Sequence, residues 1–260
     1  MIMALKKGDF IEIEYTGKTD DEEVFDTTDK KTAEENEIFD ERIHYGPIIV
    51  CLGENHLLEG LEKFIIGKKT GEYKVNLKPE EAFGKKSAKL LRLLPRKIFR
   101  KEEIDPYPGL EVNIDGMAGI VRNVSGGRVI VDFNHPLASK NLYYDIKINK
   151  KIQDTKQKIE SIFRLELNLS EVEIDIKGDK AIIYLEIPAE IKEKVRERLS
   201  ETIKEIKEVE FKSPEDKTQK KEEGIKKEKK EKDKNKPKKK KETKKTKGKK
   251  KTKTGSKKSK

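Results

Sequence analysis

Cysteine and histidine could form a nucleophile, a disulfide or a metal site, but their pattern favours none of these. Cys51 is the single cysteine, which excludes an internal disulfide and fits a reducing compartment. It stands inside an apolar run, so we expect a buried, inert thiol. His44, His56 and His135 are scattered without the spacing of metal ligands. We therefore predict no metal ion and no cofactor.

Aromatic and acidic side chains offer a different chemistry, the binding of an apolar ligand beside a few polar groups. Tyr15 belongs to the inward face of residues 9–17, in which apolar and acidic residues alternate. Phe25 and Asp26 interrupt a polar segment, and Phe83 is the one large apolar residue of an acidic loop. Each also has an ordinary structural explanation: Tyr15 as core, Asp26 as a loop cap, and Phe83 as a ring packed on the body.

The stretch from residue 48 to 67 must help to position such a site. Ile48 opens an apolar run that predicts a buried strand, and Gly53 breaks the run. Helical spacing then puts one apolar face on a short helix, which ends at Gly67. So short a helix must lie against a sheet, and we interpret it as the floor of an apolar cleft. Its face is formed by Leu57, Leu58, Leu61, Phe64 and Ile65.

Alternating apolar residues predict the strands of that sheet at 9–17, 73–77 and 141–150, the first and last paired antiparallel. The charged residues 18–46 are predicted to form a long loop or flap. About sixty residues separate Gly84 from the last strand, too many for a structureless loop. Strand patterns and turn residues within them indicate a small inserted β domain.

Residues 153–212 have a pattern of their own. An apolar helix face precedes two strand patterns around Gly178 and Asp179, and Pro188 opens a second helix. An α-β-β-α unit of about sixty residues has a marginal core, so it either docks on the rest of the chain or dimerises. The stripe predicted for the second helix comprises Ile191, Val195, Leu199, Ile203 and Ile206.

Charge is distributed unevenly along the chain. Residues 213–260 contain 24 lysines, no arginine and 8 acidic residues, a net charge of +16; the whole chain carries +11, which leaves −5 for residues 1–212. With one aliphatic and no aromatic side chain, this tail is predicted to be disordered. It is either a solvated extension or a polybasic arm that contacts RNA, the ribosome or an anionic surface weakly and without sequence preference.

The sequence also lacks the segments that direct a chain to a membrane. No apolar run reaches the roughly 20 residues of a spanning helix, and the N-terminus has no signal-peptide core. We therefore expect a cytoplasmic protein.

Five short motifs follow one another in a fixed order: Y-T-G at 15–17, V-F-D-T-T at 24–28, L-G-E-N-H-L-L-E-G-L-E at 52–62, P-E-E-A-F-G at 79–84 and D-F-N-H-P-L-A at 132–138. With them the sequence resembles the FKBP-type peptidyl-prolyl cis-trans isomerases, and within these the SlyD-like branch that carries an insert-in-flap domain. The resemblance covers about residues 5–152. The unit at 153–212 resembles that of the long archaeal members in its architecture.

The resemblance implies a twisted antiparallel FKBP sheet wrapped on a short helix. Together with the patterns described above, the predicted fold class is α+β, with an inserted small β domain, a C-terminal α+β domain and a disordered tail. The expected domains are residues 1–86 with 133–152 for the isomerase and 87–132 for the insert. Residues 153–212 form the accessory domain, a possible site of homodimerisation, and 213–260 the tail.

By motif position, the resemblance implies a cleft for a prolyl ring. Tyr15 and Asp26 would orient and polarise its edge and Phe83 would cover the ring, so these three are the predicted catalytic residues. The backbone amide of Leu58 would bind a substrate carbonyl. The predicted substrate-binding residues are Phe25, Ile48, Leu57, Leu58, Leu61 and Tyr144.

The sequence departs from the family pattern in three places. Leu61 stands where the single-domain eukaryotic members carry Trp. Many SlyD-like members also have Leu at this position. Ser139 follows the last motif where Gly is usual. The His- and Cys-rich metal-binding tail of the bacterial SlyD proteins is absent, so metal binding is not inferred from the resemblance.

These features predict a folding helper that twists X-Pro amides in an apolar cleft without covalent chemistry, while the inserted domain holds unfolded chains. Its partners would be unfolded or proline-containing polypeptides. The alternative is a non-catalytic adaptor or chaperone that the Lys-rich tail anchors to RNA, the ribosome or an anionic surface. The presence of Tyr15, Asp26 and Phe83 together favours catalysis.

Overall fold

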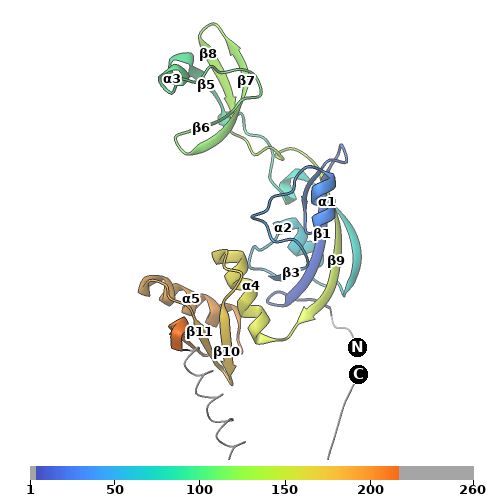
Figure 1. Ribbon diagram of the computed structural model, residues 1–260. Helices are drawn as coiled ribbons and strands as arrows, with labels where there is room; N and C mark the ends of the chain where they lie inside the picture. Colours follow the sequence, from blue (N-terminus) through green and yellow to red (C-terminus); the bar gives the residue numbers. More distant parts are fainter. Residues whose placement is uncertain (1–3, 217–260) are drawn as a thin grey trace, which may run out of the picture. The chain divides into compact units, whose positions relative to one another are not determined.

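Strand β1 (Phe10–Thr19) is the centre of a five-stranded antiparallel sheet in the computed structural model, which describes residues 4–216 (Figure 1). It pairs with β2 (Val24–Thr27), β3 (Ile48–Cys51) and β9 (Leu142–Ile152), and β4 (Gly71–Leu77) pairs with β9. The strands expected from alternating apolar residues are thus confirmed. The predicted Lys-rich tail lies outside the described residues from 217 onward.

The predicted cleft-floor helix is present as α2 (Glu59–Ile65). Leu61 and Ile65 are buried on the sheet among Ile11 and Ile13 of β1. The helix begins after Leu58, which occupies the N-cap position without a side-chain hydrogen bond. Leu58 therefore belongs to the cleft loop, where its N–H has no intrahelical acceptor.

Residues 18–46, predicted to be a long loop, contain more structure than expected. β1 extends to Thr19, β2 follows, and α1 (Lys30–Glu35) begins after Asp29, whose side chain accepts a hydrogen bond of 2.8 Å from the Thr32 N–H. Of the residues in α1 only Ala33 is buried. A helix with so narrow an apolar face has no periodic signal in the sequence, and only its cap could have been recognised.

A second sheet, in the order β5-β8-β7-β6, is formed by β5 (Leu91–Pro95), β6 (Glu111–Ile114), β7 (Met117–Ser125) and β8 (Arg128–Asp132). The strand patterns between Gly84 and β9 are confirmed. The sequence did not predict α3 (Arg96–Lys101), which directly follows Pro95. Phe99 of this helix is buried against Val121 and Val129, so one aromatic side chain holds the helix on the sheet.

A third sheet has the order β10-β11-β12 and is built from β10 (Glu173–Lys177), β11 (Lys180–Tyr184) and β12 (Glu208–Lys212). The helices α4 (Thr155–Leu167) and α5 (Ala189–Thr202) precede and interrupt it. The predicted α-β-β-α order is present, but β12, parallel to β11, was missed.

The predicted α5 stripe needs a correction for two members. Ile203 and Ile206 lie beyond the end of the helix and are nevertheless buried, at 0% and 2% exposure. The chain turns there to enter β12, so these two side chains join the core from a turn. Both residues are apolar because they are buried, so the apolar pattern in the sequence does not show that the helix ends before them.

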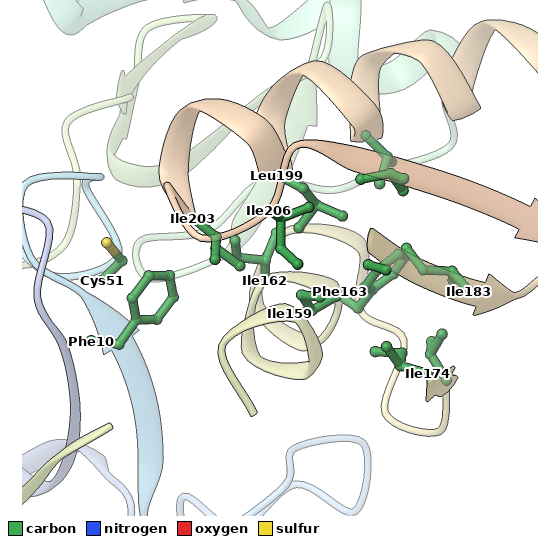
Figure 2. Packing of buried hydrophobic residues seen from close by; sticks show 14 of the residues in the cluster. Phe10, Cys51, Ile159, Ile162, Phe163, Ile174, Ile183, Leu199, Ile203 and Ile206 are labelled. Carbon is green, nitrogen blue, oxygen red and sulfur yellow. The ribbon is translucent and has the colours of Figure 1, made fainter. Parts of the chain in front are cut away.

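The third sheet and its helices share a hydrophobic core with the first sheet (Figure 2). Phe10 of β1 and Cys51 of β3 are both buried in the same cluster as Ile162 of α4 and Leu199 of α5. Of the two possibilities for residues 153–212, the structure shows docking on β1 and β3, whereas dimerisation stays a prediction. Over residues 4–216 no helix combines the length and apolarity that a membrane span needs.

Gly60 of α2 makes a close contact that can be tested by substitution. A Cβ atom there would lie 2.6 Å from the backbone oxygen of Glu81 and 2.8 Å from Leu77 Cδ2. Although Ala is about 1 kcal/mol better than Gly within a helix, we expect Gly60→Ala to destabilise the fold by about 1–3 kcal/mol through overpacking. Urea unfolding measures this change.

Lys63→Ala in the same helix is the matched control. Lys63 is exposed and forms an i,i+4 ion pair with Glu59, so its loss should change stability by less than about 0.5 kcal/mol. A Gly60→Ala variant that is more stable than the wild type would show that α2 can shift freely away from residues 77–81.

Candidate functional site

A cavity of about 700 Å³ opens beside the N-terminal end of α2. Its walls come from β1, β2, β9, the loop before α2, and two segments near Phe83 and Leu137. Eight of the nine predicted site residues line it: Tyr15, Phe25, Asp26, Leu57, Leu58, Leu61, Phe83 and Tyr144. The ninth, Ile48, does not line this cavity; it is half-buried and packs against the core of the first sheet.

Three aromatic rings form one side of the cavity. Tyr144 of β9 makes an edge-to-face contact with Phe25, with centroids 5.7 Å apart and planes at 89°, and a second with Tyr15 at 6.0 Å and 61°. Gly17 of β1 lies directly beneath two of these rings, since a Cβ atom there would lie 2.8 Å from both Phe25 Cζ and Tyr144 Cε1. The rings can take these positions because residue 17 has no side chain.

Tyr15 and Asp26 form the polar edge of the cavity. The Tyr15 hydroxyl donates a hydrogen bond of 3.0 Å to Asp26 Oδ2. Burial, together with the nearby charge of Asp26, raises the pKa of Tyr15 well above its usual range, so the phenol stays a neutral donor. Burial likewise raises the pKa of Tyr144.

Asp26 itself keeps part of its surface open to solvent at the rim of the cavity. Even there, desolvation by the surrounding protein raises the pKa of its carboxyl group, and the hydrogen bond from Tyr15 opposes that rise only in part. The site therefore combines a ring-binding surface with one polarising Tyr–Asp pair.

The sequence did not single out five further lining residues. His135 stacks on Phe83, with ring centroids 4.0 Å apart and planes at 4°, and its Nδ1 accepts a hydrogen bond of 3.2 Å from the Leu137 N–H. The fifth motif could have revealed this wall, because it contains the H-P-L sequence. The added residues are Asn55, His56, His135, Pro136 and Leu137.

Ser139 closes the wall that carries His135 and Leu137. Its φ is +66°, in the left-handed region that a glycine adopts more easily. Its N–H donates to the Gly84 oxygen at 2.9 Å, and its hydroxyl accepts from the Lys86 N–H at 2.8 Å. The serine thus adds a hydrogen bond that a glycine at this position could not make.

The lining is suited to holding an apolar ring more than to covalent chemistry. Cys51, the single thiol, is buried in the core and does not line this cavity, and burial raises its pKa to about 12. Among residues 4–216 no group of three or more His, Cys, Asp or Glu residues is arranged to hold a metal ion.

Comparison with known proteins agrees with this geometry. The short-type peptidyl-prolyl cis-trans isomerase of Methanocaldococcus jannaschii is 34% identical over 149 residues, which are 57% of this chain and 94% of that protein. The FKBP-type 16 kDa peptidyl-prolyl cis-trans isomerase of Escherichia coli is 36% identical over 108 residues, 39% of this chain and 72% of that protein. This chain belongs to the FKBP-type peptidyl-prolyl cis-trans isomerases.

Two further matches support the SlyD-like branch. The FKBP-type isomerase SlyD of Helicobacter pylori is 30% identical over 119 residues, 44% of this chain and 63% of that protein. Residues 92–137 match the family model described as the IF domain of FKBP26. The resemblance inferred from the five motifs is confirmed, as are isomerase activity and the α+β fold class.

The aromatic side of this FKBP-type cavity can be tested through Gly17. In Gly17→Ala the new methyl group must displace Phe25 and Tyr144 from the positions in which they line the cavity, and we expect kcat/KM to fall about tenfold, which corresponds to about 1.4 kcal/mol of lost transition-state stabilisation. Turnover of a short prolyl peptide measures the loss. Lys18→Ala, the next residue of β1, is the control and should stay within about twofold of wild type. A folded Gly17→Ala variant with wild-type kcat/KM would show that the two rings do not contact the substrate.

Proposed function

We propose that the cavity lined by Tyr15, Phe25 and Tyr144 is the prolyl site and that it twists X-Pro amides without a covalent intermediate. The observation that carries this proposal is the convergence of eight predicted residues, from segments far apart in the sequence, on one cavity. A planar amide is held by a rotation barrier of about 18–20 kcal/mol, because conjugation is lost when it twists. The planar form is the more dipolar one, so an apolar cavity favours the twisted state relative to it.

Each wall has a role in this proposal. Phe25, Leu61 and Tyr144 hold the prolyl ring, while Phe83, kept in place by His135, covers it. The Leu58 N–H lies at the start of α2 without an intrahelical partner and donates to a substrate carbonyl oxygen. Tyr15 and Asp26 polarise the edge of the site, and neither needs to transfer a proton.

A graded loss on substitution of Asp26 would support catalysis without proton transfer. We expect Asp26→Ala to lower kcat/KM about tenfold, the effect of one lost charge-assisted contact, and not to abolish turnover. Asp26→Asn keeps an acceptor for the Tyr15 hydroxyl and should lose less. A peptide assay measures both variants, and total inactivity of a folded variant would reveal acid–base chemistry.

The pH dependence provides a second check on Asp26. The pKa of its carboxyl is raised, so the carboxylate that accepts the Tyr15 hydrogen bond is present above that raised value and is lost as pH falls through it. Wild-type kcat/KM should therefore decrease at the acid end, whereas that of Asp26→Asn should not. Above the raised pKa, both profiles should be flat.

For the inserted segment, residues 87–132, we propose binding of unfolded chains and their delivery to the prolyl site. Leu91 and Leu93 support this proposal, because they are 48% and 54% exposed and project from β5, an edge strand of the second sheet. Exposed apolar residues on a strand edge are suited to contact extended, unfolded polypeptide. Holding such a chain near the cleft would raise the effective concentration of its prolines.

A double substitution separates binding of unfolded chains from catalysis. We expect Leu91→Ser with Leu93→Ser to leave short-peptide kcat/KM within about twofold, and to slow catalysis of a proline-limited refolding reaction at least about tenfold. Ile191→Ser is the matched control, since Ile191 is 40% exposed on α5, outside the insert. Equal losses on peptide and protein substrates would contradict this division of labour.

A further inference from the structure

The loop at residues 53–58 forms the wall of the cavity on the side of α2, contributing Asn55, His56, Leu57 and Leu58. Asn55 has a φ of +59°, in the left-handed region that glycine and, less often, asparagine adopt. The loop around it lies outside the helices and strands, so contacts with its surroundings must fix its shape. Its two neighbours, Glu54 and His56, are both held by side chains of residues 153–212.

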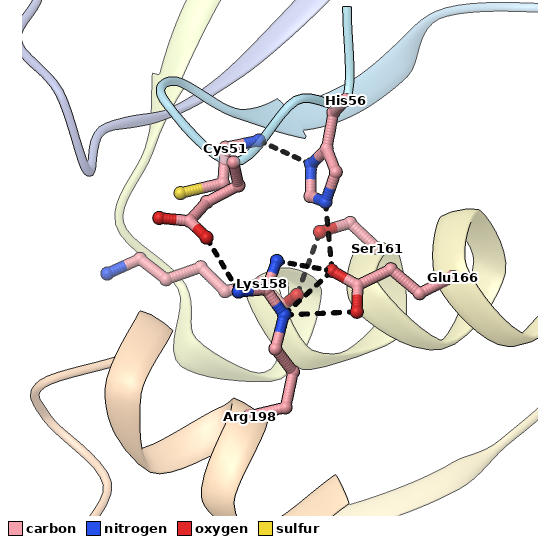
Figure 3. A network of polar contacts seen from close by, with 7 residues as sticks. Cys51, His56, Lys158, Ser161, Glu166 and Arg198 are labelled. Atoms are coloured by element: carbon pink, nitrogen blue, oxygen red, sulfur yellow. Dashed lines mark hydrogen bonds and ion pairs between the residues drawn. The ribbon is translucent and has the colours of Figure 1, made fainter. Parts of the chain in front are cut away.

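His56 makes the first link (Figure 3). Its side chain is only 5% exposed. The backbone N–H of Cys51 donates 3.1 Å to Nδ1, so Nδ1 carries no proton and Nε2 does. Nε2 donates 3.0 Å to Glu166 Oε1 of α4. This tautomer lets the ring connect the end of β3 to α4 through the cleft loop.

Arg198 of α5 makes the second link. It is bidentate to Glu166, with Nε 3.0 Å from Oε2 and Nη2 2.7 Å from Oε1, and its Nη1 donates 2.6 Å to Glu54 Oε2. These side chains are only about one-quarter to one-third exposed, which limits screening by solvent. Burial opposes ionisation of Glu166, but hydrogen bonds from Arg198 and His56 outweigh it and lower the pKa of that carboxyl.

We propose that Glu166 and Arg198 are positioning residues for the prolyl cleft: residues 153–212 hold the wall formed by 54–58 in the shape that binds substrate. The inference rests on the proposed role of the cavity. It assigns the C-terminal segment a part in peptide turnover itself, in addition to any part in binding protein clients. The sequence alone gave no sign of it, since His56 and Glu166 are 110 residues apart.

Loss of the contacts that hold residues 54–58 should raise KM and leave kcat nearly unchanged. If the loop samples several shapes, only a fraction of the enzyme is competent to bind, and the apparent KM rises by the inverse of that fraction. Saturating substrate selects the competent shape, so kcat stays close to wild type. We expect Arg198→Ala to raise KM about tenfold, which is less than the roughly 10²-fold effect of a 1 Å misplacement of reacting groups.

The experiment measures kcat and KM of the full chain on a short prolyl peptide, together with the melting temperature. Arg198→Lys keeps the charge without the bidentate geometry and should recover part of the KM loss. Glu54→Gln removes the charge from one contact and leaves the Arg198–Glu166 pair, so its KM should lie between those of wild type and Arg198→Ala. Backbone amide signals of residues 54–58 should shift in the same order.

Arg196→Ala is the matched control. Arg196 lies on the same helix and bonds to the Val209 oxygen and to Glu193, both within residues 153–212. Because these contacts stabilise only the C-terminal segment, loss of the Arg196 side chain should lower the melting temperature and leave KM unchanged. A similar KM increase in Arg196→Ala and Arg198→Ala would mean that general loosening of the segment is responsible, and would overturn the proposal.

Failure of this inference can be told apart from failure of the proposed prolyl site. If Gly17→Ala lowers kcat/KM but Arg198→Ala and Glu54→Gln do not change KM, the cavity is the site and the positioning role is wrong. If Gly17→Ala also has no effect, both proposals fail. Should Arg198→Ala not fold, Glu54→Gln and Glu166→Gln decide the question by the same KM criterion, with unchanged KM in both overturning the proposal.

Discussion

The start of β1 is buried on both faces, and much of the structure depends on that constraint. Ile11 points into the core beneath α2, and its neighbour Phe10 points into the core formed with α4 and α5. Alternation along a strand sends successive side chains to opposite faces, so a single strand can serve two cores only if both faces are covered. Removal of α2, or of α4 and α5, would expose a large apolar residue of β1, the strand that also carries Tyr15 and Gly17. The cavity beside α2 and the C-terminal segment are therefore not energetically independent.

The cavity itself is an apolar surface with a small polar edge. Its walls are mainly aromatic and aliphatic, and its tyrosines remain neutral because burial disfavours the phenolate. Such a site has little to offer a reaction that needs proton transfer or a nucleophile. It is well suited to amide rotation, in which the charge separation of the planar form is reduced as the bond twists. The absence of a side chain at Gly17 is as necessary to this surface as the rings that lie above it.

Much of this arrangement could be predicted from the sequence, for definite physical reasons. Alternating residues predicted β1, β4 and β9, an apolar run predicted β3, and apolar spacing predicted α2. The resemblance based on the five ordered motifs implied eight of the lining residues, whereas β2 was missed. Elements held by one or two side chains escaped prediction: α1 buries only Ala33 and α3 only Phe99. β12 escaped because Ile203 and Ile206 are spaced as if the preceding helix continued. Ile48 was assigned to the site by motif position, but its side chain packs on the core.

The polar contacts that shape the cavity walls could not be predicted, because they join residues far apart in the sequence. The wall with His135 is closed where Ser139 bonds to Gly84 and Lys86, and the wall with His56 is closed by Glu166 and Arg198. His56 and Ser139, the wall residues held by these contacts, both lie in loops outside the helices and strands. The floor of the cleft is fixed by packing in a hydrophobic core, whereas its walls are fixed by hydrogen bonds. The wall loops can therefore change conformation while the floor keeps its structure. Segments that meet those walls, such as residues 153–212, can thereby influence how tightly the cleft binds without touching the substrate.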